Sequence, residues 1–301
     1  MAEGFVIGAG VIIAGLLLEL TTGGVKWDMF AAPVNYITLA VLIAVIAAIY
    51  LLGRKVYFFS FLRTYQAAVP TLVYAVVLTM IMGLTRQQKD GQWLNDMLTF
   101  WPFVLIYLLM VVILGLVTIN HCQKIVAVLR NRKQLSTSKL LSTINFQLST
   151  VLCHLGLFIV ITTGTLGSAD MQRLKMVTNY DELKWWALDE QYKTHELPIA
   201  IELKKFIMEE YDDGSPKRFA SEVQIYTKSG KNIQGTIEVN KPLTVDGYKI
   251  YQYGYDEQYG AMSQISILEL VRDPWLPAVY TGIVMLLIGA AGMMFGRGKI
   301  K

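Results

Sequence analysis

Six long apolar stretches are the feature that most constrains how this chain can fold. They occupy residues 5–20, 33–52, 67–84, 98–119, 146–166 and 276–295. A helix needs about 20 residues to cross roughly 30 Å of hydrocarbon, where its backbone groups must hydrogen-bond to one another. Apolar residues make up 54% of the chain and charged residues only 17%, a balance typical of membrane proteins. We therefore expect an α-helical polytopic membrane protein with six transmembrane helices.

The first stretch is expected to stay in the protein as a helix. The residues before it, MAEG, contain Glu3 and no basic residue, and no small-residue cleavage motif follows. A cleavable signal peptide usually has a positively charged start and such a motif.

Basic residues predict the orientation of the helices. Three connections are rich in Lys and Arg and contain no acid: Arg54, Lys55 and Arg63; Lys124, Arg130, Arg132, Lys133 and Lys139; Arg297, Lys299 and Lys301. The alternating connections balance their charges: Lys26 with Asp28, and Arg86 and Lys89 with Asp90 and Asp96. Excess basic residues mark the cytoplasmic side. We expect a multi-pass protein of the cytoplasmic membrane with both termini in the cytoplasm.

The net charge of +4 is mostly this orientation signal. The basic loop 121–145 could bind anionic membrane lipid, but its plainest role is to orient the helices. Because the net charge is mostly an orientation signal, it is weak evidence for nucleic acid, and we expect no nucleic-acid partner.

The predicted organisation has three parts. Residues 1–168 form a five-helix membrane domain, residues 169–273 an extracytoplasmic (periplasmic) β-rich domain, and residues 274–301 the sixth helix with a basic cytoplasmic tail. The β-rich domain is thus inserted between the fifth and sixth helices.

Alternating apolar and polar residues predict an antiparallel β domain, for which a sandwich is the suggested arrangement. The strands expected are 197–211, 218–227, 233–240, 248–255 and 262–271, with turns at Asp213-Gly214, Ser229-Gly230 and Asp246-Gly247. Residues 170–196 are richer in charge, and we expect an irregular or partly helical connector there.

Three tyrosines in the fourth of these strands are a possible docking surface. Tyr251, Tyr253 and Tyr255 recur at every second residue and are predicted to share one face. That face could bind a peptide or a planar ligand, although aromatic packing on a core is the favoured interpretation.

No conventional catalytic motif is present, so no catalytic residue is predicted. The sequence lacks HExxH, GxSxG, a Walker loop and a GxGxxG after a strand. Cys122 and Cys153 form no CxxC pair and are interpreted as apolar fillers. A proton pump or ion-coupled transporter normally has several ionisable groups in its helices, and this chain has almost none.

His154 is the exception, because it lies inside an apolar stretch. Its imidazole is predicted either to hydrogen-bond to a neighbouring helix or to ligate haem iron. The residues alone leave both interpretations open. Gly156, Gly164 and Gly167 would let either a flat cofactor or another helix approach closely.

The other two histidines are predicted to have no ligand role. His121 is expected at the end of the fourth helix, in contact with the membrane interface. His195, in a Thr-His-Glu sequence, is expected to be a solvated surface residue.

From the fifth helix onward the chain resembles the ResB (CcsB) family of cytochrome c biogenesis proteins. The segments that carry the resemblance are His154 in the helix before the β domain, then RFASEVQIYTKSG, IEVNKPLTVDGYKIYQYGYD and VRDPWLPAVYTGIVMLLIGAAGMMF. The match covers about half of the chain. Family members usually have four helices, whereas six are predicted here.

The resemblance implies a subunit of a membrane complex that moves haem outward and supports its attachment to the CxxCH cysteines of apocytochrome c. The implied partners are a ResC/CcsA-type membrane protein, apocytochrome c and haem b in transit. It also favours His154 as an axial ligand of the haem iron. Because the partner's tryptophan-rich motif is missing, thioether formation is expected to fall to another chain, which makes this one a non-catalytic subunit of a haem lyase complex.

Two other functional classes stay open on the residues alone. One is a structural membrane scaffold or assembly factor without haem, in which His154 only packs helices. The other is a component of a solute-binding transporter or sensor.

Overall fold

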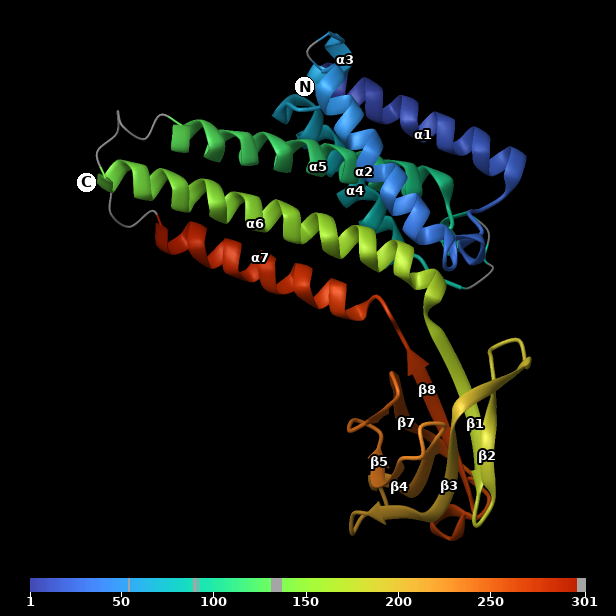
Figure 1. The fold of residues 1–301 in the computed structure, drawn as a ribbon. Coiled ribbons are helices and arrows are strands. Elements are labelled where there is room, and N and C mark those ends of the chain that lie inside the picture. Colours follow the sequence, from blue (N-terminus) through green and yellow to red (C-terminus); the bar gives the residue numbers. More distant parts are fainter. Residues whose placement is uncertain (54, 89–90, 92, 131–136, 297–301) are drawn as a thin grey trace. The chain divides into compact units, whose positions relative to one another are not determined.

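The computed structural model describes residues 1–53, 55–88, 91, 93–130 and 137–296 (Figure 1). The chain divides into two compact units. The helical unit comprises Met1–Ala169 and the segment from Trp275 onward, and the sheet unit comprises Asp170–Pro274. Several charged residues used to predict the orientation lie outside the described residues: Arg54, Lys89, Asp90, Arg132, Lys133, Arg297, Lys299 and Lys301.

Among the described residues, six helices are long and apolar enough to cross a membrane, which confirms the six predicted spans. They are α1 (Ala2–Thr22), α2 (Val34–Leu52), α4 (Tyr65–Leu84), α5 (Trp101–Arg130), α6 (Thr137–Gly167) and α7 (Leu276–Gly296). A short helix, α3 (Tyr57–Phe61), joins α2 to α4. The 3₁₀ turns are Trp27–Phe30, Trp93–Asn95, Ser168–Asp170 and Gly260–Met262.

Helix α5 is the centre of the helical unit. Half of its most apolar window is buried by other helices, the largest share among the six. Ile106 and Leu116 are fully buried and belong to two clusters that include side chains of α1, α2 and α4. The peripheral helices instead expose apolar side chains such as Val6 and Leu84, as expected for surfaces that face lipid.

Helices α5 and α6 are longer than predicted. The prediction ended the fourth helix at His121 and Cys122, and this is wrong because α5 continues to Arg130. The predicted span followed the apolar run, which stops at Gln123 and Lys124. Both residues are good helix formers, and Ile125 and Val126 continue the helix beyond them.

Helices α6 and α7 pack closely through glycines. A Cβ atom added to Gly282 would lie 2.8 Å from the carbonyl oxygen of Gly156, and one added to Gly156 would lie 2.6 Å from that of Gly282. Further along the pair, a Cβ at Gly289 would lie 2.7 Å from the amide nitrogen of Cys153. Small residues let two membrane helices approach at backbone distance and gain van der Waals contact.

The sheet unit is one antiparallel sheet of eight strands in the order β5-β4-β3-β2-β1-β8-β7-β6. The strands are β1 (Gln172–Asn179), β2 (Leu183–Leu188), β3 (Thr194–Glu210), β4 (Pro216–Thr227), β5 (Asn232–Glu238), β6 (Leu243–Val245), β7 (Tyr248–Tyr255) and β8 (Ile265–Arg272). The five predicted strands correspond to β3, β4, β5, β7 and β8. Positive φ angles at Gly214, Gly230 and Gly247 confirm the predicted turns.

The predicted irregular or partly helical connector over 170–196 is wrong, because this segment forms β1 and β2. Leu174, Met176 and Thr178 of β1 are buried, while Arg173 and Lys175, which flank Leu174, are exposed. The alternation of buried and exposed residues typical of a strand is therefore present in β1. The charged residues at its exposed positions led to the prediction of an irregular connector. The three-residue strand β6 was also missed.

The sheet rolls on itself, so that its two halves pack face to face without forming a separate second sheet. Its interior contains one apolar cluster that draws on all eight strands and includes Ile199, Ile225 and Leu268. A polar group crosses this interior. Ser221 on β4 donates to Gln252 Oε1 on β7 at 2.6 Å, and its hydroxyl lies 2.7 Å from that of Ser266 on β8.

We predict that Gly282→Leu destabilises the helical unit. The added side chain has no space against Gly156 and Val160, so α6 and α7 must separate. Gly164→Leu on α6 is the matched control, because nothing lies within 4 Å of a Cβ at that position. Thermal unfolding of the detergent-purified protein is the measurement. Equal melting temperatures for the two variants would contradict the packing argument.

We predict that Gln252→Leu destabilises the sheet unit by about 1–3 kcal/mol, because Ser221 and Ser266 stay buried and lose their amide partner. Hydrogen exchange of the β7 and β8 amides should accelerate accordingly. Ser229→Ala in the exposed β4–β5 turn is the control and should leave these rates unchanged. Wild-type exchange in Gln252→Leu would show that the cluster adds no stability.

Candidate functional site in the helical unit

His154 lies in the second half of α6, and its own helix fixes the orientation of its ring. Its Nδ1 is 2.7 Å from the carbonyl oxygen of Thr150, one turn earlier. Because a carbonyl only accepts, Nδ1 must carry the proton and donate it. Nε2 then holds a lone pair, and among the described residues it makes no hydrogen bond. The ring is half-buried.

His121 on α5 lies beside His154. The two ring centroids are 5.5 Å apart, and the ring planes differ by 27°. His121 Nδ1 is 2.8 Å from Oε1 of Gln147, which is also on α6. The predicted position of His121 at a helix end is wrong, since α5 continues for nine residues beyond it. Sequence reasoning missed this pairing of two imidazoles.

Some residues near the two histidines pack helices together, and others make polar contacts. Gly156 packs against α7 and Gly167 against Trp275, so helix packing accounts for two of the three predicted glycines. Next to His121, Asn120 accepts a hydrogen bond from Arg63 at 2.6 Å, and the Arg63 guanidinium lies over the Tyr50 ring at 4.3 Å.

The two imidazoles are too few to hold a metal ion that needs four protein ligands, but they suit a metal that brings its own. Among the described residues, no group of three or more His, Cys, Asp and Glu side chains is close enough to share a metal ion. Cys153 does not face the histidines, because its thiol donates to the carbonyl oxygen of Leu286 on α7 at 3.6 Å. The imidazole pair therefore suits a metal that brings most of its own ligands. Haem iron, which takes one or two axial imidazoles, is such a metal.

In the sheet unit, the three predicted docking tyrosines do not share one face. A β-bulge between Gln252 and Gly254 shifts the register, so that Tyr251 pairs with the outward Glu269 and Tyr255 with the buried Ser266. Tyr253 remains on the outer face, where Lys175 lies 3.9 Å from its ring centroid. A docking role for Tyr251, Tyr253 and Tyr255 stays a prediction.

Tyr255 packs inside the sheet unit. Its ring stacks on Phe206 and on Phe219, each at 5.2 Å. The common-face prediction failed because the bulge inserts one residue into the alternation, which the regular spacing of the tyrosines does not reveal.

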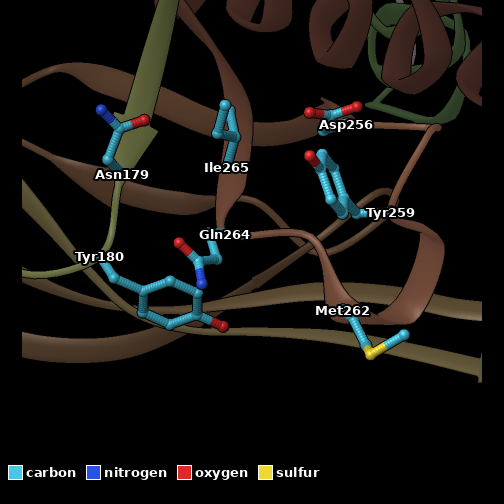
Figure 2. A pocket seen from close by; sticks show the side chains of 7 residues that line it. All are labelled: Asn179, Tyr180, Asp256, Tyr259, Met262, Gln264 and Ile265. Carbon is cyan, nitrogen blue, oxygen red and sulfur yellow. The ribbon is translucent and has the colours of Figure 1, made fainter.

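A cavity of about 490 Å³ opens at the end of the sheet unit opposite its two chain connections. Figure 2 shows Asn179 and Tyr180 on one side, Asp256, Tyr259 and Met262 on the other, and Gln264 and Ile265 between them. The amide, phenol and carboxylate groups make it a mostly polar hollow with one acidic side chain. Sequence reasoning did not identify it, because its residues come from two segments that are far apart in the sequence, 179–180 and 256–265.

His195 lies in the β2–β3 hairpin, paired with an aspartate. Its Nε2 is 2.8 Å from Oδ2 of Asp189, and Oδ1 of Asp189 accepts from the amides of Gln191 and Lys193, each at 2.9 Å. Its side chain is 38% exposed. The Asp189 carboxylate thus binds two backbone amides of the turn and the imidazole of His195.

Comparison with known proteins gives consistent matches to cytochrome c biogenesis. Residues 145–264 match the ResB-like family. A cytochrome c biogenesis protein CcsB of Prochlorococcus marinus subsp. pastoris is 27% identical over 143 residues, which cover 47% of this chain and 32% of that protein. Protein NrfI of Wolinella succinogenes is 33% identical over 96 residues, which cover 31% of this chain and 10% of that protein. The matched regions thus span about a third and a tenth of these relatives.

The solved structure of the cytochrome c haem lyase CcmF is similar over 87% of this chain and 45% of that chain, with a TM-score of 0.40 and 12% identity. At this TM-score the similarity supports no conclusion about function. His154 and most of the sheet unit lie within the ResB-like region, whereas α1 to α5 and His121 precede it.

We predict that the β2–β3 hairpin loosens in acid. The hydrogen bond with His195 and then that with the Lys193 amide hold the pKa of Asp189 below its ordinary value. A carboxyl with a lowered folded pKa stabilises the fold above its unfolded pKa of about 3.9, and this contribution disappears as the pH falls through the folded value. Hydrogen exchange over residues 189–195, corrected for intrinsic rates, should therefore accelerate below about pH 4.

Asp189→Asn is the control for this prediction, since the amide keeps an acceptor oxygen but does not titrate. Exchange in that variant should depend less on pH. The same pH dependence in both proteins would show that another group controls the hairpin.

Proposed function

We propose that this chain, whose residues 145–264 match the ResB-like family, is a membrane subunit in cytochrome c biogenesis that takes part in moving haem outward. Haem is its cargo, and His154 is the residue that ligates the iron within the helical unit. The proposal combines the family relationship with the chemistry of one side chain.

The single observation that carries the proposal is the hydrogen bond from His154 Nδ1 to the Thr150 carbonyl. It fixes the tautomer in which Nε2 is the free electron-pair donor, and it holds the ring in one orientation. Histidines that ligate metals usually have this second hydrogen bond. A histidine that only tied two helices together would direct its donor to the neighbouring helix, whereas here the donor is used within α6.

The sheet unit is proposed to act on the extracytoplasmic side, as the distribution of basic residues predicts, with both chain ends in the cytoplasm. Its candidate contacts with a ResC/CcsA-type membrane protein or with apocytochrome c are the outer-face residues Tyr251 and Tyr253. Exposed aromatic residues are common in protein interfaces, and Tyr253 is 55% exposed.

The chain is proposed to be a non-catalytic subunit. Thioether formation requires reduced thiols and a site that holds haem against the CxxCH cysteines, and these are assigned to the partner chain. What this chain contributes is a fixed imidazole in an apolar surrounding and an outer domain for docking.

The test is a hemin titration of the full-length protein purified in detergent, followed by absorption spectroscopy. His154→Ala should weaken hemin binding about tenfold or more, because the axial nitrogen is lost. Cys153→Ala is the matched control, since this neighbouring side chain points toward α7, and it should bind hemin as the wild type does.

The scaffold interpretation makes the opposite prediction. If His154→Ala binds hemin with unchanged affinity and spectrum, or if the wild type binds none alone and none with its co-purified partner, His154 is a packing residue and the haem proposal is wrong.

A further inference from the structure

We infer that the cavity at the end of the sheet unit is a binding site for a basic side chain, arginine or lysine, of a protein partner. The cavity belongs wholly to the sheet unit, whereas His154 belongs to the helical unit. The inference therefore does not depend on the proposed handling of haem.

The Asp256 carboxylate is the charged group of this cavity, and the loop between β7 and β8 holds it in place. Its Oδ1 accepts a hydrogen bond from the backbone amide of Gln258 at 3.1 Å, and the backbone amide of Asp256 donates to the hydroxyl of the buried Ser263 at 3.1 Å. Among the described residues, Oδ2 accepts no hydrogen bond and forms no ion pair. One oriented carboxylate oxygen is therefore available to a ligand.

The other polar side chains of the cavity add acceptors and no positive charge. Asn179 donates its amide nitrogen to Glu182 at 2.6 Å, so its carbonyl oxygen remains as an acceptor. Among the described residues, Gln264 makes no hydrogen bond, and none of those that line the cavity is Lys or Arg. A carboxylate with amide acceptors and no counter-charge matches a cation that donates several hydrogen bonds, as guanidinium and ammonium groups do.

Aromatic and aliphatic surface lies beside these acceptors (Figure 2). Tyr180 forms part of one wall, and its phenol oxygen accepts a hydrogen bond from the Phe206 amide at 2.8 Å, which fixes the ring. Tyr259 lies next to Asp256 on the opposite wall, and Ile265 lies between the walls. Aromatic rings attract cations, and an aliphatic side chain can contact the methylene groups that carry the charge in Arg and Lys.

The rim of the cavity favours a protein partner over a free small cation. Tyr259 is 63% exposed and Met262 is 82% exposed, although both side chains line the cavity. Aromatic residues and methionine are enriched where proteins contact one another, and a basic side chain that enters a pocket is a frequent anchor of such contacts. A partner whose Arg or Lys enters the cavity would cover both exposed side chains.

Two other kinds of occupant fit the cavity less well. Its volume of about 490 Å³ lies within the range of roughly 300–1,000 Å³ typical of ligand sites, which a bare metal ion would not fill. A Ca²⁺ ion also takes about six to eight oxygen ligands, whereas among the described residues no three His, Cys, Asp or Glu side chains are close enough to share an ion. An anion would meet the charge of Asp256 with no basic residue to offset it.

The experiment titrates the full-length protein in detergent with two capped peptides, acetyl-Gly-Arg-Gly-amide and the same peptide with citrulline in place of arginine. Citrulline keeps the shape of arginine and lacks its charge. Saturation-transfer NMR detects the weak binding expected of a single side chain. The arginine peptide should bind about tenfold more tightly than the citrulline peptide, because the guanidinium forms a charge-assisted hydrogen bond with Asp256.

Asp256→Asn should remove this preference, so that the variant binds the two peptides with equal affinity. Its amide keeps an oxygen for the Gln258 backbone, which preserves the loop. Glu257→Gln is the matched control, because it changes the net charge by the same amount at an exposed residue that does not line the cavity. This control should keep the tenfold preference.

Two further measurements separate recognition from misfolding and a protein partner from a free cation. Gln264→Glu places a second carboxylate in the cavity and should tighten binding of the arginine peptide severalfold, a gain that misfolding cannot imitate. Propylguanidine, which is the arginine side chain without a backbone, should bind the wild type more weakly than the arginine peptide because it cannot contact the rim.

Three results would overturn the inference. Equal binding of the two peptides by the wild type, or binding of neither, would show that the cavity does not recognise positive charge. A preference for arginine that survives in Asp256→Asn would place the cation elsewhere on the protein. Propylguanidine that binds as tightly as the peptide would show that the cavity takes a free cation. None of these results concerns hemin binding by the helical unit, so the proposed function is tested separately.

Discussion

The close contact between α6 and α7 determines which side of α6 is available to pack against α5. Gly156, Gly282 and Gly289 bring the two backbones together, and Cys153 turns its thiol to the α7 backbone. Successive residues of a helix are about 100° apart, so His154 lies on a different side of α6 from Cys153, next to His121 of α5. The glycine contact therefore sets the direction of the imidazole.

The sheet unit has to bury its apolar side chains within a single sheet. Rolling the sheet lets Ile225 on β4 and Leu268 on β8 share one core. The polar group formed by Ser221, Gln252 and Ser266 lies inside that core with its hydrogen bonds made. The bulge at Tyr253 and the stacking of Tyr255 belong to the same arrangement, because the register shift turns Tyr255 inward.

Much of this architecture could be predicted from the sequence because it depends on local patterns. Six apolar stretches and five alternating strands follow directly from residue order. The failures have particular causes. Outward-pointing Lys175 concealed β1, Lys124 concealed the continuation of α5, and one inserted residue in β7 broke the common face of the tyrosines.

The pairing of His121 with His154 could not be predicted from residue order. His121 lies nine residues before the end of α5, whereas His154 lies seventeen residues after the start of α6. In a symmetric hairpin the partner of His121 would be near residue 146, so the true pairing depends on how far the two helices are offset. That offset is set by tertiary packing such as the α6–α7 contact.

The junction between the two units has a consequence for assembly. Gly167 at the end of α6 packs against Trp275, which precedes α7, and β1 and β8 pair from Gln172 and Arg272 onward. The intervening chain therefore leaves and returns at one place. Loop closure carries an entropy penalty that grows slowly with length. The α6–α7 contact and the β1–β8 pairing both bring together the same two points of the chain, so the second of them to form incurs little of this penalty. Folding of either unit therefore brings together the two chain segments at which the other unit begins.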